Sequence, residues 1–385
     1  MIVRRLRKNE RNKCAFLMGT AFRYSTEPND SELDEDLIGC FKDDGETLMS
    51  QISVKDYKTC FCGKEIGCLG IAGVSTYPEY RRHGCIKTLF KEIFKEIEEK
   101  DWVVSLLYPF SYRYYRQYGY EVVFTRKSLT FEPSFLSHIE RNSDAVLYHG
   151  EPEYKKALLS LYEEYYKNHF ACLKREEDTK IYCENPEKTL NYTYLCFDGE
   201  TPCGYFICRP DGDKLELTEL VYNSPKALKI VLGFLRNFDG QFRYIYLPYC
   251  ENDNPVEYML LPDYKLTLGA FYALQGRVLQ VGKLLSINEY PKTSGSFKLK
   301  IFGDFIEKNN GVYTVSYGEK TDVKFEKDGD CDIALPIHSF SRLAFGGVPE
   351  KNIPYLDGAE IKNPDAVKSL AAAFPTRPIN TFEHF

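Results

Sequence analysis

The chain contains one order of segments twice: an apolar strand, a short loop, an amphipathic helix and a second apolar strand ending at or just before a proline. This order predicts two copies of one α/β fold, with chance similarity as the alternative explanation. The second copy is shorter, 27 positions from Val221 to Pro248 against 35 from Val74 to Pro109, and much of the difference falls in the loop. The two sets of pieces are LGIAGVST, a loop over 78–85, a helix from Ile86 to about Lys100 and WVVSLLYP, and then LELTELVY, a loop over 223–225, a helix from Lys226 to about Phe238 and FRYIYLP.

A third segment follows the two copies. At 385 residues the chain exceeds what one hydrophobic core usually organises. After Ser286 come several β-type runs separated by turn signals, and then two helical runs, which together predict an α+β module. We therefore expect three domains, at residues 1–145, 146–285 and 286–385. The β-type runs cover 297–302, 312–317, 323–325 and 333–337, and the helical runs cover 339–345 and 366–374.

Composition and charge exclude several classes of protein. Hydrophobic residues at 43%, aromatic residues at 15% and charged residues at 28% describe a globular chain. Fifty basic against 56 acidic residues give a net charge of −6, which argues against a nucleic-acid partner. The sequence shows neither a membrane-spanning run nor a signal sequence, so we expect a cytoplasmic protein with no membrane partner.

The thirteen cysteines are expected to be reduced and mostly buried, because many lie inside apolar runs. Cys60, Cys62 and Cys68 suggest a metal cluster as the alternative. Their spacing is not that of a zinc site and no histidine lies beside them, so we expect no metal.

The loop before the first helix has the chemistry of an anion site. Arg81-Arg82-His83-Gly84-Cys85 precedes a helix whose apolar positions share one face. A helix N-terminus offers free N–H groups, glycine allows close approach, and arginine neutralises a pyrophosphate. A solvated turn is the alternative interpretation. The second copy has no glycine in this loop, and Pro225 has no N–H, so only the first copy is expected to bind phosphate.

The segment from Pro78 to Ile86, followed by a helix, a strand and Tyr114-Tyr115-Arg116-Gln117-Tyr118-Gly119-Tyr120, resembles the GNAT N-acetyltransferases. Their R/Q-x-x-G-x-G/A loop cradles the pyrophosphate of acetyl-CoA, and their Y-x-x-x-G-[FY] segment supplies a tyrosine near the thioester sulfur. Ile86 departs from the last position of the loop motif. With the length and the three-part layout, this departure resembles the Eis (enhanced intracellular survival) branch: a GNAT domain, a degenerate second GNAT domain and a sterol-carrier-protein-like domain.

The resemblance implies a set of site residues. Tyr115 is the expected general acid, and the terminal carboxylate of Phe385 is the expected base, or else an attractor of the substrate cation. His83 is expected to serve as a cation or donor rather than a base, and Cys85 is not needed as a nucleophile because direct transfer requires none. Acetyl-CoA is the implied co-substrate, and the residues expected to bind it are Val74, Ser75, Thr76, Arg82, His83, Gly84, Cys85, Ile86, Lys87, Phe110 and Ser111.

The resemblance also implies the acceptor class and the assembly. Amine-bearing molecules are expected, including aminoglycoside-like polycations and lysine side chains, and the assembly is expected to be a homo-oligomer, a hexamer as in that branch. The run from Glu27 to Asp36 has six acids and no basic residue, so it either attracts a polycation or forms a solvated loop. Two rival functions stay open: a lipid or apolar-ligand carrier that uses the third domain, and an acetyltransferase for one lysine of a protein partner.

Overall fold

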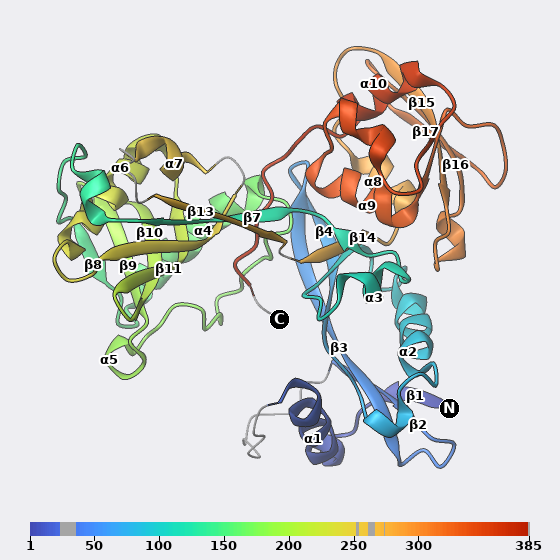
Figure 1. Ribbon diagram of the computed structural model, residues 1–385, viewed down its shortest axis with the longest axis horizontal. Helices are drawn as coiled ribbons and strands as arrows, with labels where there is room; N and C mark the ends of the chain where they lie inside the picture. The colour runs from blue at the N-terminus through green and yellow to red at the C-terminus, as the bar shows by residue number, and fades with distance from the viewer. Residues whose placement is uncertain (24–35, 252–253, 261–265, 273, 384–385) are drawn as a thin grey trace.

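The computed structural model describes residues 1–23, 36–251, 254–260, 266–272 and 274–383. These residues form three mixed α/β lobes, each built on its own sheet (Figure 1). The lobes contain two seven-stranded sheets and one five-stranded sheet. The predicted fold class, two tandem α/β units followed by an α+β unit, is confirmed.

The first sheet has the strand order β1-β2-β3-β4-β5-β14-β6, with β4 and β5 parallel. The apolar residues of α2 are buried against it, as the helical spacing predicts, although the helix ends early and its last turn is a 3-10 turn at Phe94–Glu96. The strands are β1 (Ile2–Arg5), β2 (Leu37–Phe41), β3 (Leu48–Phe61), β4 (Lys64–Thr76), β5 (Trp102–Leu107), β6 (Glu121–Val122) and β14 (Gln275–Val278), and the helices are α1 (Arg11–Phe22), α2 (Cys85–Ile93) and α3 (Tyr112–Arg116).

The second sheet has the order β13-β7-β12-β11-β10-β9-β8, with β11 and β12 parallel. Its strands are β7 (Thr125–Phe131), β8 (Ala145–Leu147), β9 (Tyr192–Asp198), β10 (Thr201–Asp211), β11 (Lys214–Tyr222), β12 (Tyr244–Cys250) and β13 (Thr267–Tyr272). Its helices are α4 (Pro152–Asn168), α5 (Pro186–Thr189), α6 (Pro225–Leu235) and α7 (Pro255–Met259).

The repeat seen in the sequence is present in space. In the first sheet β3 and β4 are antiparallel, β4 and β5 are parallel, and α2 connects the parallel pair. In the second sheet β10, β11, α6 and β12 have the same relations. The two lobes are therefore two versions of one strand–helix–strand arrangement.

The first two sheets exchange strands near the expected domain boundaries. Strand β7, before residue 145, pairs with β12 and β13 of the second sheet, and β14, just before residue 285, pairs with β5 and β6 of the first. The division at these two positions stays a prediction. Each of the first two sheets therefore contains a strand from the part of the chain that was assigned to the other domain.

The third sheet has the order β17-β16-β15-β18-β19. Its core is continuous with that of the first sheet, because Val103, Val104 and Leu106 of β5 belong to the same buried cluster as Leu299 and Phe340. An ion pair without solvent exposure, Arg277 Nη2 to Asp304 Oδ1 at 2.7 Å, also joins the two lobes. The elements are α8 (Val281–Ile287), β15 (Gly295–Phe302), β16 (Gly311–Tyr317), β17 (Asp322–Glu326), β18 (Ile333–Pro336), α9 (Ile337–Gly346), β19 (Glu360–Ile361) and α10 (Pro364–Ala373).

The chain after α10 returns from the third lobe and passes between the other two (Figure 1). The main chain of Phe170, which follows α4, forms a bridge to this C-terminal segment: its N–H donates to Pro378 O at 3.1 Å, and its carbonyl accepts from Asn380 N at 3.2 Å. The last described residue is Glu383.

Candidate active site

Strands β4 and β5 part in the middle of the first sheet. Their parallel pairing runs from Gly67 and Trp102 to Ile71 and Leu107, and β4 then continues to Thr76 beside β3 but without β5. A β-bulge lies in this last stretch of β4, because Ser75 pairs with Gln51 of β3 and Ala72 with Ser53. Two residues of β4 therefore oppose one residue of β3, which bends the strand locally.

The bulge places the residues predicted to face the acetyl and pantetheine groups. Gly73 at the bulge has φ +57°, a conformation that favours glycine. Val74, Ser75 and Thr76 follow it on the stretch of β4 that no longer pairs with β5. Ser50 of β3 fixes this stretch, since its hydroxyl donates to Ser75 O at 2.7 Å and lies 2.8 Å from Thr76 Oγ1.

The loop predicted to bind a pyrophosphate forms the N-terminus of α2. Gly84 is the N-cap residue with φ +81°, and no side chain caps the helix there. A Cβ added to Gly84 would meet no atom within 4 Å, so the space beside the Gly84 Cα is open. Arg82, with φ +65°, and His83 are exposed beside it. An uncapped helix N-terminus with exposed basic side chains can bind an anion.

The second lobe lacks these features at the corresponding place. Helix α6 begins with Pro225, and the Ser224 hydroxyl accepts from Ala227 N at 3.1 Å. One of the first N–H groups is therefore satisfied by the chain itself and another is missing. That only the first copy receives phosphate stays a prediction.

Cys85, Ile86 and Lys87 open helix α2 in different environments. Cys85 and Ile86 belong to the buried cluster under the first sheet, whereas Lys87 is exposed. The Cys85 thiol lies 3.9 Å from Tyr80 O and is 2% exposed as a residue, so it packs as a small apolar side chain. Only main-chain groups of Cys85 and Ile86 are placed to meet a ligand at this helix end.

Tyr115 lies in α3, which follows β5. It is 2% exposed and packs between aromatic rings, with centroids 5.4 Å from Phe110 and 6.3 Å from Tyr120. Burial raises the pKa of Tyr115 well above its ordinary value, so the phenol keeps its proton at neutral pH. Ser111 caps α3 by accepting from Tyr114 N at 3.4 Å, and Phe110 is 66% exposed. The ring of Phe110 is thus available at the surface beside a protonated phenol.

Residues 2–123 match the family model described as an acetyltransferase (GNAT) domain. This match spans the bulge, the helix α2 N-terminus and Tyr115. The protein is an acyltransferase with an N-terminal GNAT domain. GNAT domains use acetyl-CoA as co-substrate and act on amine-bearing substrates.

Solved structures similar to this acyltransferase agree in fold along its whole length. A probable N-acyltransferase from Enterococcus faecalis is 20% identical, with a TM-score of 0.83 and coverage of 100% of this chain and 99% of the other. A GCN5-related N-acetyltransferase from Anabaena variabilis is 18% identical, with a TM-score of 0.84 and both chains fully covered. Eis1 from Mycobacterium abscessus is 16% identical, with a TM-score of 0.83 and both chains fully covered. A search of curated proteins found no match.

The C-terminal segment reaches the GNAT domain at the end of β5. Tyr108, the residue after β5, donates through its hydroxyl to Glu383 O at 2.7 Å. Arg126 on β7 donates to Thr381 O and lies 3.3 Å from the Tyr108 hydroxyl. The end of the described chain therefore lies where β4 and β5 part. Phe385, the predicted base, lies outside the described residues, as do Glu27, Asp30, Glu32, Asp34 and Glu35 of the acidic run.

Sequence reasoning missed Tyr108 and Arg126 as residues that hold this segment, and also Arg175, whose Nε donates to Glu383 Oε1 at 2.8 Å. No local motif marks them, because each acts on a residue far away in the chain. Within the described ranges, no group of three or more His, Cys, Asp and Glu side chains could hold a metal ion. No helix in the same part of the chain is long and apolar enough to cross a membrane.

Proposed function

We propose that the protein transfers the acetyl group of acetyl-CoA directly to a primary amine of a polycationic small molecule or a lysine side chain. The observation that carries the proposal is that three features lie beyond the paired part of the central strands β4 and β5 of the first sheet. These are the bulged end of β4, which no longer pairs with β5, the uncapped N-terminus of α2 and the buried phenol of Tyr115. The expected coenzyme contacts are those named above for Val74–Thr76, Arg82–Lys87, Phe110 and Ser111.

The reaction needs a proton acceptor and a proton donor. An amine with a pKa of about 10.4 is neutral in only about one molecule in 10³ at pH 7, so a base assists its attack on the thioester carbon. The N–C bond forms, the C–S bond breaks, and the amine proton passes to the base. The departing thiolate takes a proton from Tyr115, whose raised pKa keeps the phenol protonated.

The Phe385 carboxylate is the proposed base, directly or through a water molecule. Its ordinary pKa of about 3.3 to 3.7 is low for this role, so a water relay or partial burial has to compensate. Support comes from the described part of the segment, since the main chain of Glu383 is hydrogen-bonded to Tyr108 at the end of β5. Removal of Phe385 moves the carboxylate back by one residue and is expected to lower the rate.

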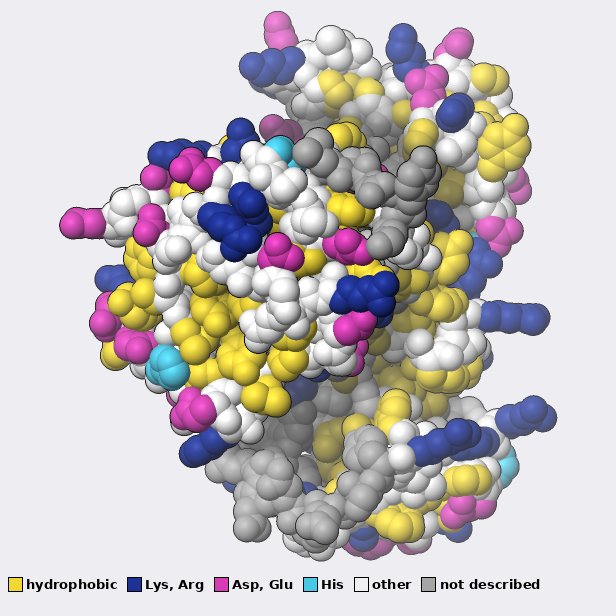
Figure 2. Space-filling model, turned by 60° about the vertical axis from the view of Figure 1, so that its left-hand side comes forward, with side chains coloured by type: hydrophobic (Ala, Val, Ile, Leu, Met, Phe, Trp, Pro, Cys, Tyr) yellow, Lys and Arg dark blue, Asp and Glu magenta, His cyan; other side chains and the backbone are white. Residues whose placement is uncertain are grey.

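We also propose that the protein is a homo-oligomer. Strand β13 is at an edge of the second sheet, and its Leu268, Phe271 and Tyr272 are exposed. Figure 2 shows hydrophobic side chains gathered across one face of the molecule, with charged groups of both signs around them. Exposed apolar patches with a polar rim are typical of protein interfaces. Sedimentation velocity tests this proposal, and a monomer at micromolar concentration would overturn it.

The decisive experiment is thiol release from acetyl-CoA with a panel of polyamines, aminoglycosides and lysine peptides. Turnover with several multi-amine compounds and N-acetylated products by mass spectrometry is the expected result. Turnover with one protein acceptor alone would instead favour a protein-specific acetyltransferase. Copurification of an apolar ligand with the chain, without amine turnover, would favour the carrier function.

A further inference from the structure

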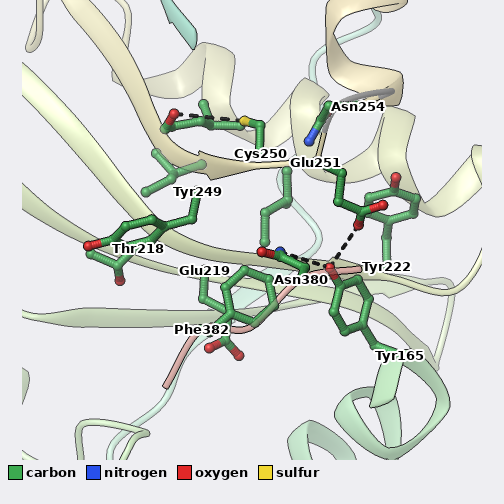
Figure 3. Close-up of a pocket in the computed structure, with 13 residues that line it drawn as sticks. Tyr165, Thr218, Glu219, Tyr222, Tyr249, Cys250, Glu251, Asn254, Asn380 and Phe382 are labelled. Carbon is green, nitrogen blue, oxygen red and sulfur yellow. Dashed lines mark hydrogen bonds between the residues drawn. The ribbon is translucent and has the colours of Figure 1, made fainter. Parts of the chain in front are cut away.

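The second lobe repeats the strand divergence of the GNAT domain. Strands β11 and β12 pair only from Lys214 to Glu216 and from Tyr244 to Tyr246, and both then continue, to Tyr222 and Cys250. The C-terminal segment lies against the diverging ends, where Asn380 and Phe382 line a small chamber (Figure 3). The remaining cavity is about 30 Å³, space for about one or two water molecules. The C-terminal segment thus occupies, in the second lobe, the position that corresponds to the proposed coenzyme site of the first lobe.

Contacts inside the chamber fix Asn380. Its amide Nδ2 donates to the Tyr165 hydroxyl at 3.1 Å, and that hydroxyl donates to Glu251 Oε1 at 2.9 Å. The ring of Tyr165 lies 5.4 Å from that of Phe382. The sticks in Figure 3 show these groups facing one another from α4, from Glu251 directly after β12 and from the C-terminal segment. Both side chains of the segment are therefore held by the second lobe.

Glu383 meets a buried receptor on the same lobe. Arg175 forms two parallel bonds of 2.7 Å to the carboxylate of Glu219, through Nη1 and Nη2. Its Nε donates to Glu383 Oε1 at 2.8 Å. The side chains of Arg175 and Glu219 are each 3% exposed, and that of Glu383 is 14% exposed. Because Glu219 occupies the fork of the guanidinium, the third donor remains for the segment.

Aromatic residues complete the receptor. The Arg175 guanidinium carbon lies 3.6 Å from the centroid of the Tyr162 ring. The Tyr162 hydroxyl donates to Leu173 O at 2.7 Å and lies 3.2 Å from Glu383 Oε1. Tyr205 donates to Glu219 on the other side. These groups exclude water from the ion pair, which makes the carboxylate of Glu383 hard to replace by solvent.

We propose that the second lobe serves as a receptor for the chain's own C-terminal segment, and that Arg175 and Glu219 are positioning residues for acetyl transfer. The side chain of Glu383 is held by the second lobe while its main-chain carbonyl accepts from Tyr108 in the GNAT domain. The second lobe therefore helps to fix where the C-terminal segment lies at the reaction site of the GNAT domain. This inference rests on the proposed function, in which the end of the chain takes part in transfer.

The test compares Glu383→Gln with Glu216→Gln in the full-length protein. Glu383→Gln removes the charge but leaves Arg175 paired with Glu219, so the lobe keeps its core. Glu216→Gln is the matched control, because Glu216 on β11 pairs with Arg209 at 2.6 Å and none of the hydrogen bonds found for it involves the segment. Hydrogen exchange of residues 378–383, kcat, and the KM for acetyl-CoA are measured for each variant, together with the melting temperature.

Glu383→Gln is expected to speed exchange in the segment and to lower kcat by about tenfold to 10²-fold, with the KM for acetyl-CoA unchanged, because misplacing a reacting group costs rate. The control should change neither. Unchanged exchange would overturn the anchor, and faster exchange with an unchanged kcat would overturn the positioning role. A wild-type chain that acetylates no amine would instead overturn the proposed function, and the exchange data would still decide whether Arg175 holds the segment.

Discussion

Replacing Tyr115 by phenylalanine removes one oxygen from the proposed site and leaves its packing in place. Within the described part of the chain the Tyr115 side chain has no hydrogen-bond partner, and its ring contacts with Phe110 and Tyr120 do not need the hydroxyl. The free energy of unfolding should therefore change by less than about 1 kcal/mol. Loss of a general acid lowers the rate by about 10²- to 10⁴-fold, which corresponds to about 3 to 5 kcal/mol in the activation barrier.

The assay is thiol release at saturating acetyl-CoA and amine, with the KM for acetyl-CoA measured in parallel. Tyr118→Phe is the control, because Tyr118 is also buried and stacks on Phe90 with ring centroids 4.3 Å apart. We expect kcat to collapse in Tyr115→Phe alone, with the KM for acetyl-CoA nearly unchanged. Retention of kcat within about threefold in Tyr115→Phe, or an equal loss in Tyr118→Phe, would refute the assignment of the acid.

Three further predictions follow from the same geometry. In Gly84→Ala the alanine has to adopt the left-handed conformation of Gly84, at a cost of about 1–2 kcal/mol, and the KM for acetyl-CoA should rise about tenfold in steady-state assays. An unchanged KM would contradict coenzyme binding at this helix end. Ser224→Ala removes the cap of α6 and should lower the free energy of unfolding by about 1 kcal/mol in urea titrations; if it raises that KM, the second lobe binds coenzyme after all. Because the amine must lose a proton and the raised pKa of Tyr115 keeps the phenol protonated, kcat/KM should climb from about pH 7 to about pH 9. If kcat/KM of the wild type falls across that range, and the fall is absent in Tyr115→Phe, the phenol ionises there and the reasoning is wrong.

The local elements of the fold could be predicted from the sequence because their signals are short-range. The helix expected from Lys226 to about Phe238 is α6, at Pro225–Leu235, followed by a 3-10 turn at Arg236–Phe238, and the strands expected in the third module are β15 to β18. Apolar periodicity and turn residues specify such elements within a window of several residues. The repeat also predicted two related lobes, because each copy keeps its own strand–helix–strand order.

The strand exchange between the lobes could not be predicted in this way. The sequences of β7 and β14 are typical of ordinary strands, and their choice of partner strand depends on pairing between residues far apart in the chain, for example Val278 with Val104.

The receptor for the C-terminal segment also depends on contacts between residues far apart in the chain. Arg175 and Glu383 are 208 positions apart, and neither has a local pattern that marks it as buried. The coenzyme-loop residues, in contrast, lie together in one motif and could be named from the sequence.

Direct transfer is the central claim, and intact-protein mass spectrometry with product analysis tests it most directly. The protein is incubated with acetyl-CoA alone and then with an aminoglycoside or polyamine added. The account predicts that Cys85 stays unmodified in the first step and that an N-acetylated amine forms in the second, with release of one CoA thiol for each amide. An acetyl group on Cys85 that passes to the amine, or acetyl-CoA binding with no amide formed from any amine, would contradict it.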